Sequence, residues 1–368
     1  MIELSTRHRS TGYTWLLAIA AVLCLPGPAS AGEAKPTATG RPDLSGTYDT
    51  ATLTPLSRPA RYGDRLTVSA EEAAAIEQYW RENLARDDMP SDPNRDAPPE
   101  GGVEVYVREF SGAAGKVGGY NSFFVDLGEN VTVINGEYRT SIITKPDNGR
   151  MPQFTRAALN RLKAQRAFYH ENTGTAWWIE MPAGPYDNPE SRPVAERCLL
   201  GFGSTSGPPM LPVMYNNMKR IVQTDEYVMI LVEMNHDARI IRMDDHHLPD
   251  GVKRWMGDSI GRWEGDTLVV ETANFRADSV YSVGTENMKV TERFSRLDAD
   301  TLLYQFTVTD PDTWQAPWSG EYTWRATTDR VFEYACHEGN YALGGILRGA
   351  RLLEREALGQ AVISSGEE

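Results

Sequence analysis

The stretch TLLYQFTVT, from Thr301 to Thr309, carries the pattern that decides the fold. Apolar and polar side chains alternate along it. In an extended chain one face would hold Leu302, Tyr304, Phe306 and Val308, and the other Gln305, Thr307 and Thr309. Successive side chains of a β-strand point to opposite faces of the sheet, so this alternation predicts a strand with one buried face.

Segments of similar character surround this one. The strands expected in the second half of the chain are 219–224, 227–236, 238–243, 262–264, 267–274, 287–297, 301–309, 320–327 and 331–337. Earlier in the chain, Asp43–Tyr48 resembles the entry into a first strand, and Asn135-Gly136 between two β-rich runs is a strong hairpin signal. Short strands at intervals of roughly 8–12 residues predict a mainly β fold, either an antiparallel barrel or a sandwich.

A few helices are expected at the periphery of the β structure. Ser69 and Glu72 have the spacing of a capping box, which predicts a helix that ends near residue 86. Further helices are expected at 155–169 and 341–357. The expected organisation is a signal peptide at 1–31, a tether, helix and polar loop at 32–102, a single β-rich domain at 103–358 and a tail at 359–368. A long aperiodic loop at 182–217 lies within the β-rich domain, where loops of this length usually serve a function or cover a cavity.

The N-terminus has the pattern of a secretory signal peptide. Arg7 and Arg9 precede an apolar run at 15–25, and the small residues Ala29-Ser30-Ala31 follow it. The run is too short to span roughly 30 Å of hydrocarbon, and no later segment approaches the length of a spanning helix. We therefore expect a periplasmic or secreted protein whose mature chain has no transmembrane segment.

Composition and cysteine content narrow the function classes. The 368 residues include 37 Lys+Arg and 51 Asp+Glu, which gives a net charge of −14. Nucleic acid is therefore not an expected partner, because neutralising its phosphates requires a basic face.

Cys24 would leave with the signal peptide. Cys198 and Cys336 would then form a disulfide in an oxidising compartment, the alternative being two buried free thiols.

Several segments resemble known families. Gly46-Thr47-Tyr48 and Gly261-Arg262-Trp263 are similar to the start of the first strand in lipocalin-like barrels. Four longer segments together resemble a large, mostly uncharacterised family of exported bacterial proteins: DNP at 187–189, ERCLLGFG at 196–203, GDSIGRWEGDTLVV at 257–270 and YACHEGNY at 334–341. The resemblance covers about residues 100–350. It implies export and a β-rich fold, and it carries no assigned activity.

Polar residues near expected strand ends are candidates for catalysis. By strand alternation, His236 shares a face with Val228, Ile230 and Val232, and His337 ends the last expected strand. The residues predicted to meet at one mouth of the barrel are His236, Arg239, Asp258, Glu292 and His337. A histidine beside a carboxylate can act as a general base, and an arginine can hold a substrate carboxylate or a developing oxyanion.

Each of these residues also has a non-catalytic, structural interpretation. The histidines at strand ends can simply make ordinary hydrogen bonds. Glu292 shares a face with apolar residues and is expected to point inward, where it either belongs to the site or forms a salt bridge, with Arg325 as a candidate partner. The aromatic residues Trp314, Trp318, Tyr322 and Trp324 either line a ligand cavity or, by default, pack the core.

Three functions from different classes are compatible with these features. The first is an exported enzyme that acts on a small organic molecule by cofactor-independent acid–base chemistry, in the lyase, isomerase or hydrolase range. The second is a periplasmic ligand-binding or carrier protein without catalysis. A third, structural possibility is an envelope-associated interaction protein with a large exposed apolar patch. No cofactor is predicted. A divalent metal at His236, His247 and His337 is an alternative, although the spacing matches no common ligand motif.

Overall fold

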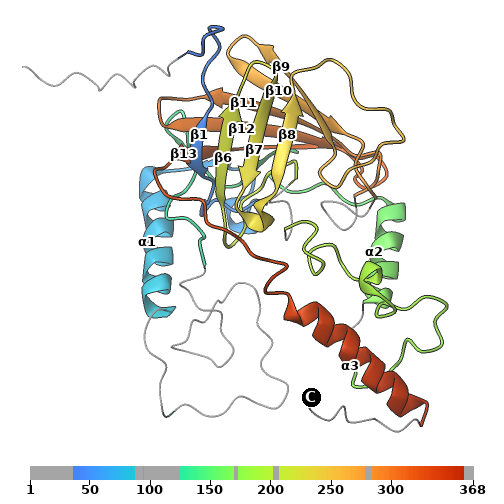
Figure 1. The fold of residues 1–368 in the computed structure, drawn as a ribbon. Helices are drawn as coiled ribbons and strands as arrows, with labels where there is room; N and C mark the ends of the chain where they lie inside the picture. Colours follow the sequence, from blue (N-terminus) through green and yellow to red (C-terminus); the bar gives the residue numbers. More distant parts are fainter. Residues whose placement is uncertain are drawn as a thin grey trace, which may run out of the picture. The chain divides into compact units, whose positions relative to one another are not determined.

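In the computed structural model, nine of the described strands close into a β-barrel (Figure 1). Around the ring they follow the order β1, β6, β7, β8, β9, β10, β11, β12, β13. Their bounds are β1 (Gly46–Asp49), β6 (Met218–Gln223), β7 (Tyr227–Val232), β8 (Ala238–Arg242), β9 (Asp258–Glu264), β10 (Thr267–Ala273), β11 (Lys289–Arg296), β12 (Thr301–Thr309) and β13 (Trp318–Ala326). The ring closes where Tyr48 of β1 pairs with Ala326 of β13. Neighbouring strands are antiparallel except for β8 and β9. The expected mainly β fold is confirmed, as a barrel rather than a sandwich.

The structure describes residues 36–87, 94, 125–169, 173–201, 207–277 and 284–359, all within one compact unit of the chain, Glu33–Glu368. Several expected features lie outside these residues. They are the signal peptide at 1–31 with Cys24, most of the polar loop before residue 103, the first part of the expected β-rich domain up to residue 124, residues 202–206 of the long loop, and the tail after Gly359.

The stretch that carries the fold pattern, Thr301–Thr309, is strand β12 over its whole expected length. Every second side chain is buried, beginning with Leu302, and the strand pairs along its length with β11 and β13. The alternation of the sequence therefore maps directly onto the inner and outer faces of the barrel.

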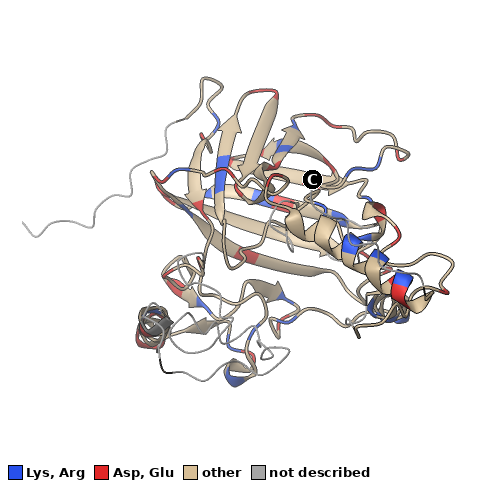
Figure 2. Ribbon diagram, turned by 60° about the horizontal axis from the view of Figure 1, so that its bottom comes forward, with Lys and Arg blue, Asp and Glu red and all other residues tan. Residues whose placement is uncertain are grey.

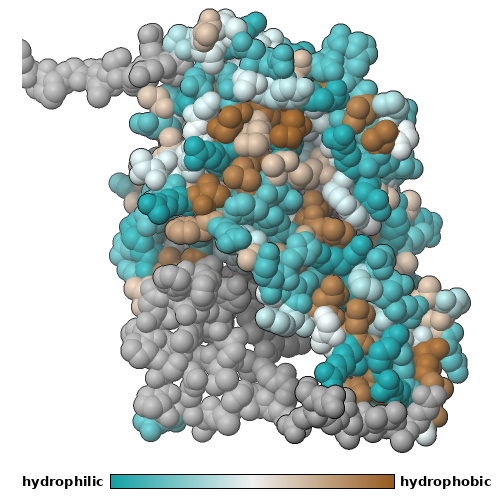
Figure 3. Space-filling view, viewed as in Figure 1, coloured by the Kyte–Doolittle hydropathy of each residue, from teal (hydrophilic) through white to brown (hydrophobic). Residues whose placement is uncertain are grey.

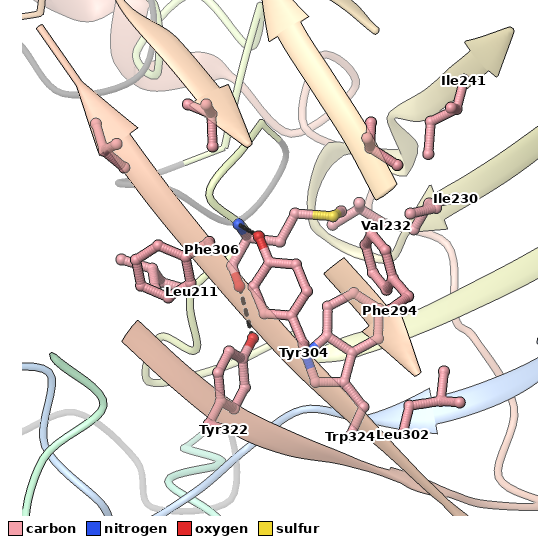
Figure 4. Packing of buried hydrophobic residues seen from close by; sticks show 14 of the residues in the cluster. Leu211, Ile230, Val232, Ile241, Phe294, Leu302, Tyr304, Phe306, Tyr322 and Trp324 are labelled. Atoms are coloured by element: carbon pink, nitrogen blue, oxygen red, sulfur yellow. Dashed lines mark hydrogen bonds between the residues drawn. The ribbon is translucent and has the colours of Figure 1, made fainter. Parts of the chain in front are cut away.

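Aromatic side chains fill the barrel (Figure 4). Fully buried in the core are Tyr48, Phe294, Tyr304, Trp318, Tyr322 and Trp324. The buried segment 207–211 inserts among them. The Met210 amide donates a hydrogen bond to the Tyr304 hydroxyl at 2.8 Å, and the Tyr322 hydroxyl donates to the Met210 carbonyl at 2.6 Å. The aromatic residues that the sequence assigned either to a cavity or to the core pack the core.

Short strands and a second sheet flank the barrel. β5 (Ile143–Lys145) pairs with the first half of β13. β2 (Thr67–Val68), β4 (Glu137–Arg139) and β3 (Val133–Ile134) form a three-stranded sheet. The expected hairpin joins β3 to β4, where Asn135 and Gly136 have φ of 53° and 81°, the left-handed values that a tight hairpin turn requires.

Three α-helices are described, and all three were expected. α1 (Ala70–Asp87) begins with the capping box, in which the Ser69 hydroxyl accepts from the Glu72 amide and the Glu72 carboxylate accepts from the Ser69 amide. α2 (Arg156–Phe168) is capped by Thr155. α3 (Tyr341–Ala357) packs against Trp178 through Ala350 and Leu353. None of the described helices has the length and apolarity needed to cross a bilayer.

Two expectations about the strands are wrong. β7 ends at Val232, and residues 234–236 form a tight turn instead of continuing the strand. Residues 331–337 form no strand, because β1 already occupies the position beside the second half of β13 and leaves no free edge there. The first strand expected near Asp43–Tyr48 is present as β1, which joins the segment 32–102 to the barrel.

The expected disulfide is present. Cys198 and Cys336 are bonded, 138 positions apart in the sequence and with their Cα atoms 5.7 Å apart. The bond fastens the segment after β13 to the long loop at 182–217.

Candidate functional site

Two of the five predicted catalytic residues, Arg239 and Glu292, meet inside the barrel. They are 2% and 0% exposed. The guanidinium donates two hydrogen bonds to the carboxylate, one of them from Nη1 to Oε1 at 2.8 Å. Arg239 also donates to the hydroxyls of Ser259 and Thr272 at 3.1 and 2.9 Å, and the Tyr304 hydroxyl donates to Glu292 Oε1 at 2.8 Å. This network joins β8, β9, β10, β11 and β12.

The network has the properties of a structural support. Both charged groups are paired and hydrogen-bonded, which is the condition under which a buried ion pair is tolerated. Burial, together with the Glu292 charge, raises the pKa of Tyr304 well above its ordinary value and keeps its hydroxyl as a donor. The salt bridge foreseen for Glu292 is therefore formed, but its partner is Arg239, whereas Arg325 is exposed.

Asp258 belongs to a different cluster, at the start of β9. Its Oδ2 lies 3.0 Å from His247 Nδ1 and accepts from the Leu248 amide at 2.9 Å and from Arg242 Nη2 at 3.0 Å. Burial pushes the pKa of Asp258 upward. The hydrogen bonds from Leu248 and His247 and the charge of Arg242 outweigh that effect, so its pKa lies below the ordinary value. The carboxylate is buried, while the His247 side chain is 27% exposed.

This His247–Asp258 pair was not predicted as a pair. Asp258 was assigned to the barrel mouth with His236, and His247 to a metal site. The two are 11 positions apart. His247 lies in the loop between β8 and β9 and Asp258 is the first residue of β9, so strand alternation gave no information about their contact.

His236 and His337 lie away from both clusters. His236 is exposed in the turn after β7, with φ of 55°, and its Nδ1 accepts from the Tyr334 amide at 3.3 Å. His337 is exposed in a turn beside the disulfide. The five predicted residues are thus distributed over the barrel interior, the loop before β9 and the segment after β13. Strand alternation failed for His236 because the strand stops four residues earlier.

The alternative metal set is not assembled either. Among the described residues, one His/Cys/Asp/Glu group of three has its ligand atoms within 4.8 Å of one another, and it is Asp244, Asp245 and His246. All three are exposed, and Asp244 is also paired with Arg242. This group has the oxygen and nitrogen ligands that could hold a metal ion.

A groove of about 940 Å³ lies where the segment after β13 crosses the barrel. We call it the C-terminal groove. Its walls comprise the Cys198–Cys336 disulfide, residues 332–336 and the first two turns of α3, including Ala342, Leu343 and Ile346. Tyr215, Asn216 and Glu233 also line it. Its surface is mainly apolar with a few polar groups, which is the usual character of ligand sites.

A buried lysine, Lys219, interacts electrostatically with Glu233. Lys219 of β6 is fully buried, its Nζ donates to the Thr50 hydroxyl at 3.2 Å, and it lies 5.9 Å from the centre of a Trp324 ring. Burial lowers the pKa of Lys219 to about 8, against the opposing charges of Asp49 and Glu233. Sequence reasoning missed Lys219, although its alternation with the buried Ile221 predicts an inward side chain.

The outer face of β6, β7 and β8 exposes a short apolar row. Val222 pairs with Met229 and Met229 with Ile240, so three apolar side chains lie side by side across three strands. Val222 and Ile240 are exposed, and Figure 3 shows hydrophobic residues among hydrophilic ones on this face.

Comparisons of the chain with protein-family models, with curated proteins and with solved structures find no match. The function is therefore inferred from the geometry of these sites.

Proposed function

We propose that the protein is an exported ligand-binding or carrier protein that holds a small organic molecule in the C-terminal groove. The observation that carries this proposal is the groove itself. Its volume of about 940 Å³ falls within the range of roughly 300–1,000 Å³ that small-molecule sites occupy, and its lining is mainly apolar. The interior of the barrel, by contrast, is filled by aromatic side chains and the Arg239–Glu292 network.

Export is part of the same proposal. The N-terminal sequence pattern is typical of a signal peptide, and the Cys198–Cys336 disulfide is the kind of bond that persists in oxidising compartments. In a periplasmic or secreted protein, the disulfide would keep two walls of the groove together.

The test is to block the groove from a position that tolerates a large side chain. Ala342 is exposed on the first turn of α3 and lines the groove, whereas Ala357 is exposed at the other end of the same helix. A bound ligand at 100 times its Kd raises the free energy of unfolding by about 2.7 kcal/mol. Compounds that stabilise the wild type in a thermal screen should therefore fail to stabilise Ala342→Trp and still stabilise Ala357→Trp. Equal stabilisation of both variants would place binding elsewhere.

The second candidate function is acid–base catalysis, which the His247–Asp258 contact favours. A buried carboxylate that fixes the ring of a partly exposed histidine is the arrangement of a positioned general base. Arg242 would supply positive charge beside it. The reaction would remain cofactor-independent, in the lyase, isomerase or hydrolase range.

The neighbouring histidine provides a matched control for this candidate. His247→Gln should abolish turnover of a chromogenic ester such as p-nitrophenyl acetate, while His246→Gln, one exposed position earlier, should leave it unchanged. If the wild type and both variants hydrolyse the ester at the same rate, catalysis by this pair is rejected.

A further inference from the structure

The charged side chains that line the C-terminal groove all carry the same sign. They are Asp126, Glu196, Glu233 and Glu333, and the described lining includes no Lys, Arg or His. Figure 2 shows that over the described chain as a whole, Lys and Arg are interspersed with Asp and Glu. The lining of the groove is therefore selectively acidic.

Two of these carboxylates are already compensated. Glu196 accepts two hydrogen bonds from Arg192, at 2.9 and 3.0 Å, which neutralise it locally. Glu233 accepts from the Asn216 side chain at 2.7 Å and has the buried Lys219 behind it.

The other two carboxylates remain as local negative charge. Asp126 accepts hydrogen bonds from neutral groups, the Gly128 amide at 3.2 Å and the Asn217 side chain at 3.5 Å. Glu333 is exposed, and no ion pair among the described residues involves it. We call Asp126 and Glu333 the rim carboxylates. A ligand in the groove would therefore meet negative charge that no cation of the described residues pairs with.

Aromatic rings lie on the same walls. Tyr215, Phe332 and Tyr334 line the groove, and Phe332 is 67% exposed, an unusual position for a large apolar ring. The face of an aromatic ring attracts a cation, and the same ring buries apolar surface. Leu343 and Ile346 of α3 extend the apolar wall. The net charge of −14 also attracts cations from a distance.

We infer that the ligand of the C-terminal groove is an organic cation with an apolar body, such as a hydrophobic amine or quaternary ammonium compound. This inference rests on the binding function proposed above. Rings and α3 side chains would cover the body, and the rim carboxylates would hold the cationic group. A simple inorganic cation would not use the apolar walls, and an organic anion would be repelled by the rim.

The experiment compares ligands that share a body and differ in charge. One set is octyltrimethylammonium, 1-octanol and octanoate, and a second set carries a 2-naphthylmethyl body with the same three kinds of head group. Binding to the full protein is measured by calorimetry at low salt. We expect each cation to bind at least tenfold more tightly than its neutral counterpart, and the anions to bind more weakly still. Added salt should reduce the preference, because the rim is exposed to solvent.

Variants assign this preference to the groove. Glu333→Gln should reduce the cation-to-neutral ratio several-fold, whereas Glu226→Gln, at an exposed position in the turn between β6 and β7, should leave the ratio unchanged. Phe332→Ala should weaken both the cation and the neutral compound.

The outcomes separate the two proposals. Equal affinity for cation and neutral compound, lost in Ala342→Trp, would overturn the charge preference and leave groove binding intact. No binding in either set would overturn the inference of an organic cation, whereas the proposed binding function stands or falls with the thermal screen. If both Glu333→Gln and Ala342→Trp keep the cation preference of the wild type, the cation site lies elsewhere and the inference is overturned.

Discussion

Single side chains inside this barrel hold strands together that are distant in the sequence. Arg239 and Glu292 lie on β8 and β11, and their hydrogen bonds reach strands β9, β10 and β12. The Tyr304 hydroxyl extends the network to the Met210 amide and so fixes the segment that fills the barrel. Removing one side chain of this network should therefore weaken the contacts among several strands of the barrel at once.

Breaking the ion pair from one side should be more harmful than removing both charges. Glu292→Ala leaves the Arg239 guanidinium buried without its counter-ion, so we expect the free energy of unfolding to fall by about 3–5 kcal/mol. The double variant Arg239→Met with Glu292→Leu should recover a large part of that loss. Urea denaturation measures both. A double variant as unstable as Glu292→Ala would contradict the electrostatic explanation.

Lys219 should make stability depend on pH in the alkaline range. Its pKa is about 8 in the folded chain and has an ordinary value of 10.5. Between these values the unfolded state binds more protons than the folded state, so this residue makes stability rise with pH from about 8 to 10.5. Below pH 8 both states are protonated, and the unfavourable contribution of burying the charge is complete.

The measurement is the difference between wild type and Lys219→Met, because other groups titrate in the same range. This difference should favour the variant below pH 8 and shrink as the pH rises to 10.5. A difference that stays constant over that range would mean that Lys219 titrates alike in both states.

At the scale of elements, the pairing of β5 with β13 depends on a glycine. A Cβ at Gly320 would lie 2.5 Å from Phe306 Cζ and 2.8 Å from the Ile142 carbonyl oxygen, and neither buried group can move away freely. Gly320→Ala should therefore cost about 1–3 kcal/mol of stability. Gly345→Ala is the matched control, because a Cβ there meets nothing within 4 Å and the helix interior favours alanine by up to about 1 kcal/mol. The midpoint of thermal unfolding should fall for Gly320→Ala and rise for Gly345→Ala.

Local sequence signals predicted elements better than sites. The bounds of α3 and β12 agree with expectation, because the helical stripe and the two-residue alternation are local properties. The segment 331–337 also alternates, yet it forms no strand, since β1 occupies the edge it would need. His236 was misplaced because the end of β7 is set by a turn with left-handed Asn235 and His236. The Arg239–Glu292 contact was within reach of strand parity, whereas the C-terminal groove depends on where a nonregular segment crosses the barrel.

At the scale of the whole molecule, the disulfide ties the C-terminal segment to the long loop. Closing a loop across 138 positions should stabilise the protein by on the order of 4–5 kcal/mol if chain entropy dominates. The double variant Cys198→Ala with Cys336→Ala should lose stability of that order. It should also lose affinity for groove ligands, because both cysteines line the groove. An unchanged affinity would mean that the walls keep their positions without the covalent link.

The closure of the ring has a consequence for how the chain acquires its shape. β1 pairs on one side with β6 and on the other with β13, so both of its partners are made long after it. Its edge toward β6 can pair once residues 218–223 are available, but its edge toward β13 stays open until residues 318–326 are available. Pairings between strands so remote in sequence form slowly. Until they form, unpaired strand edges that promote aggregation are exposed. Folding of this protein should accordingly benefit more from chaperones than folding of a β protein whose neighbouring strands are consecutive in sequence.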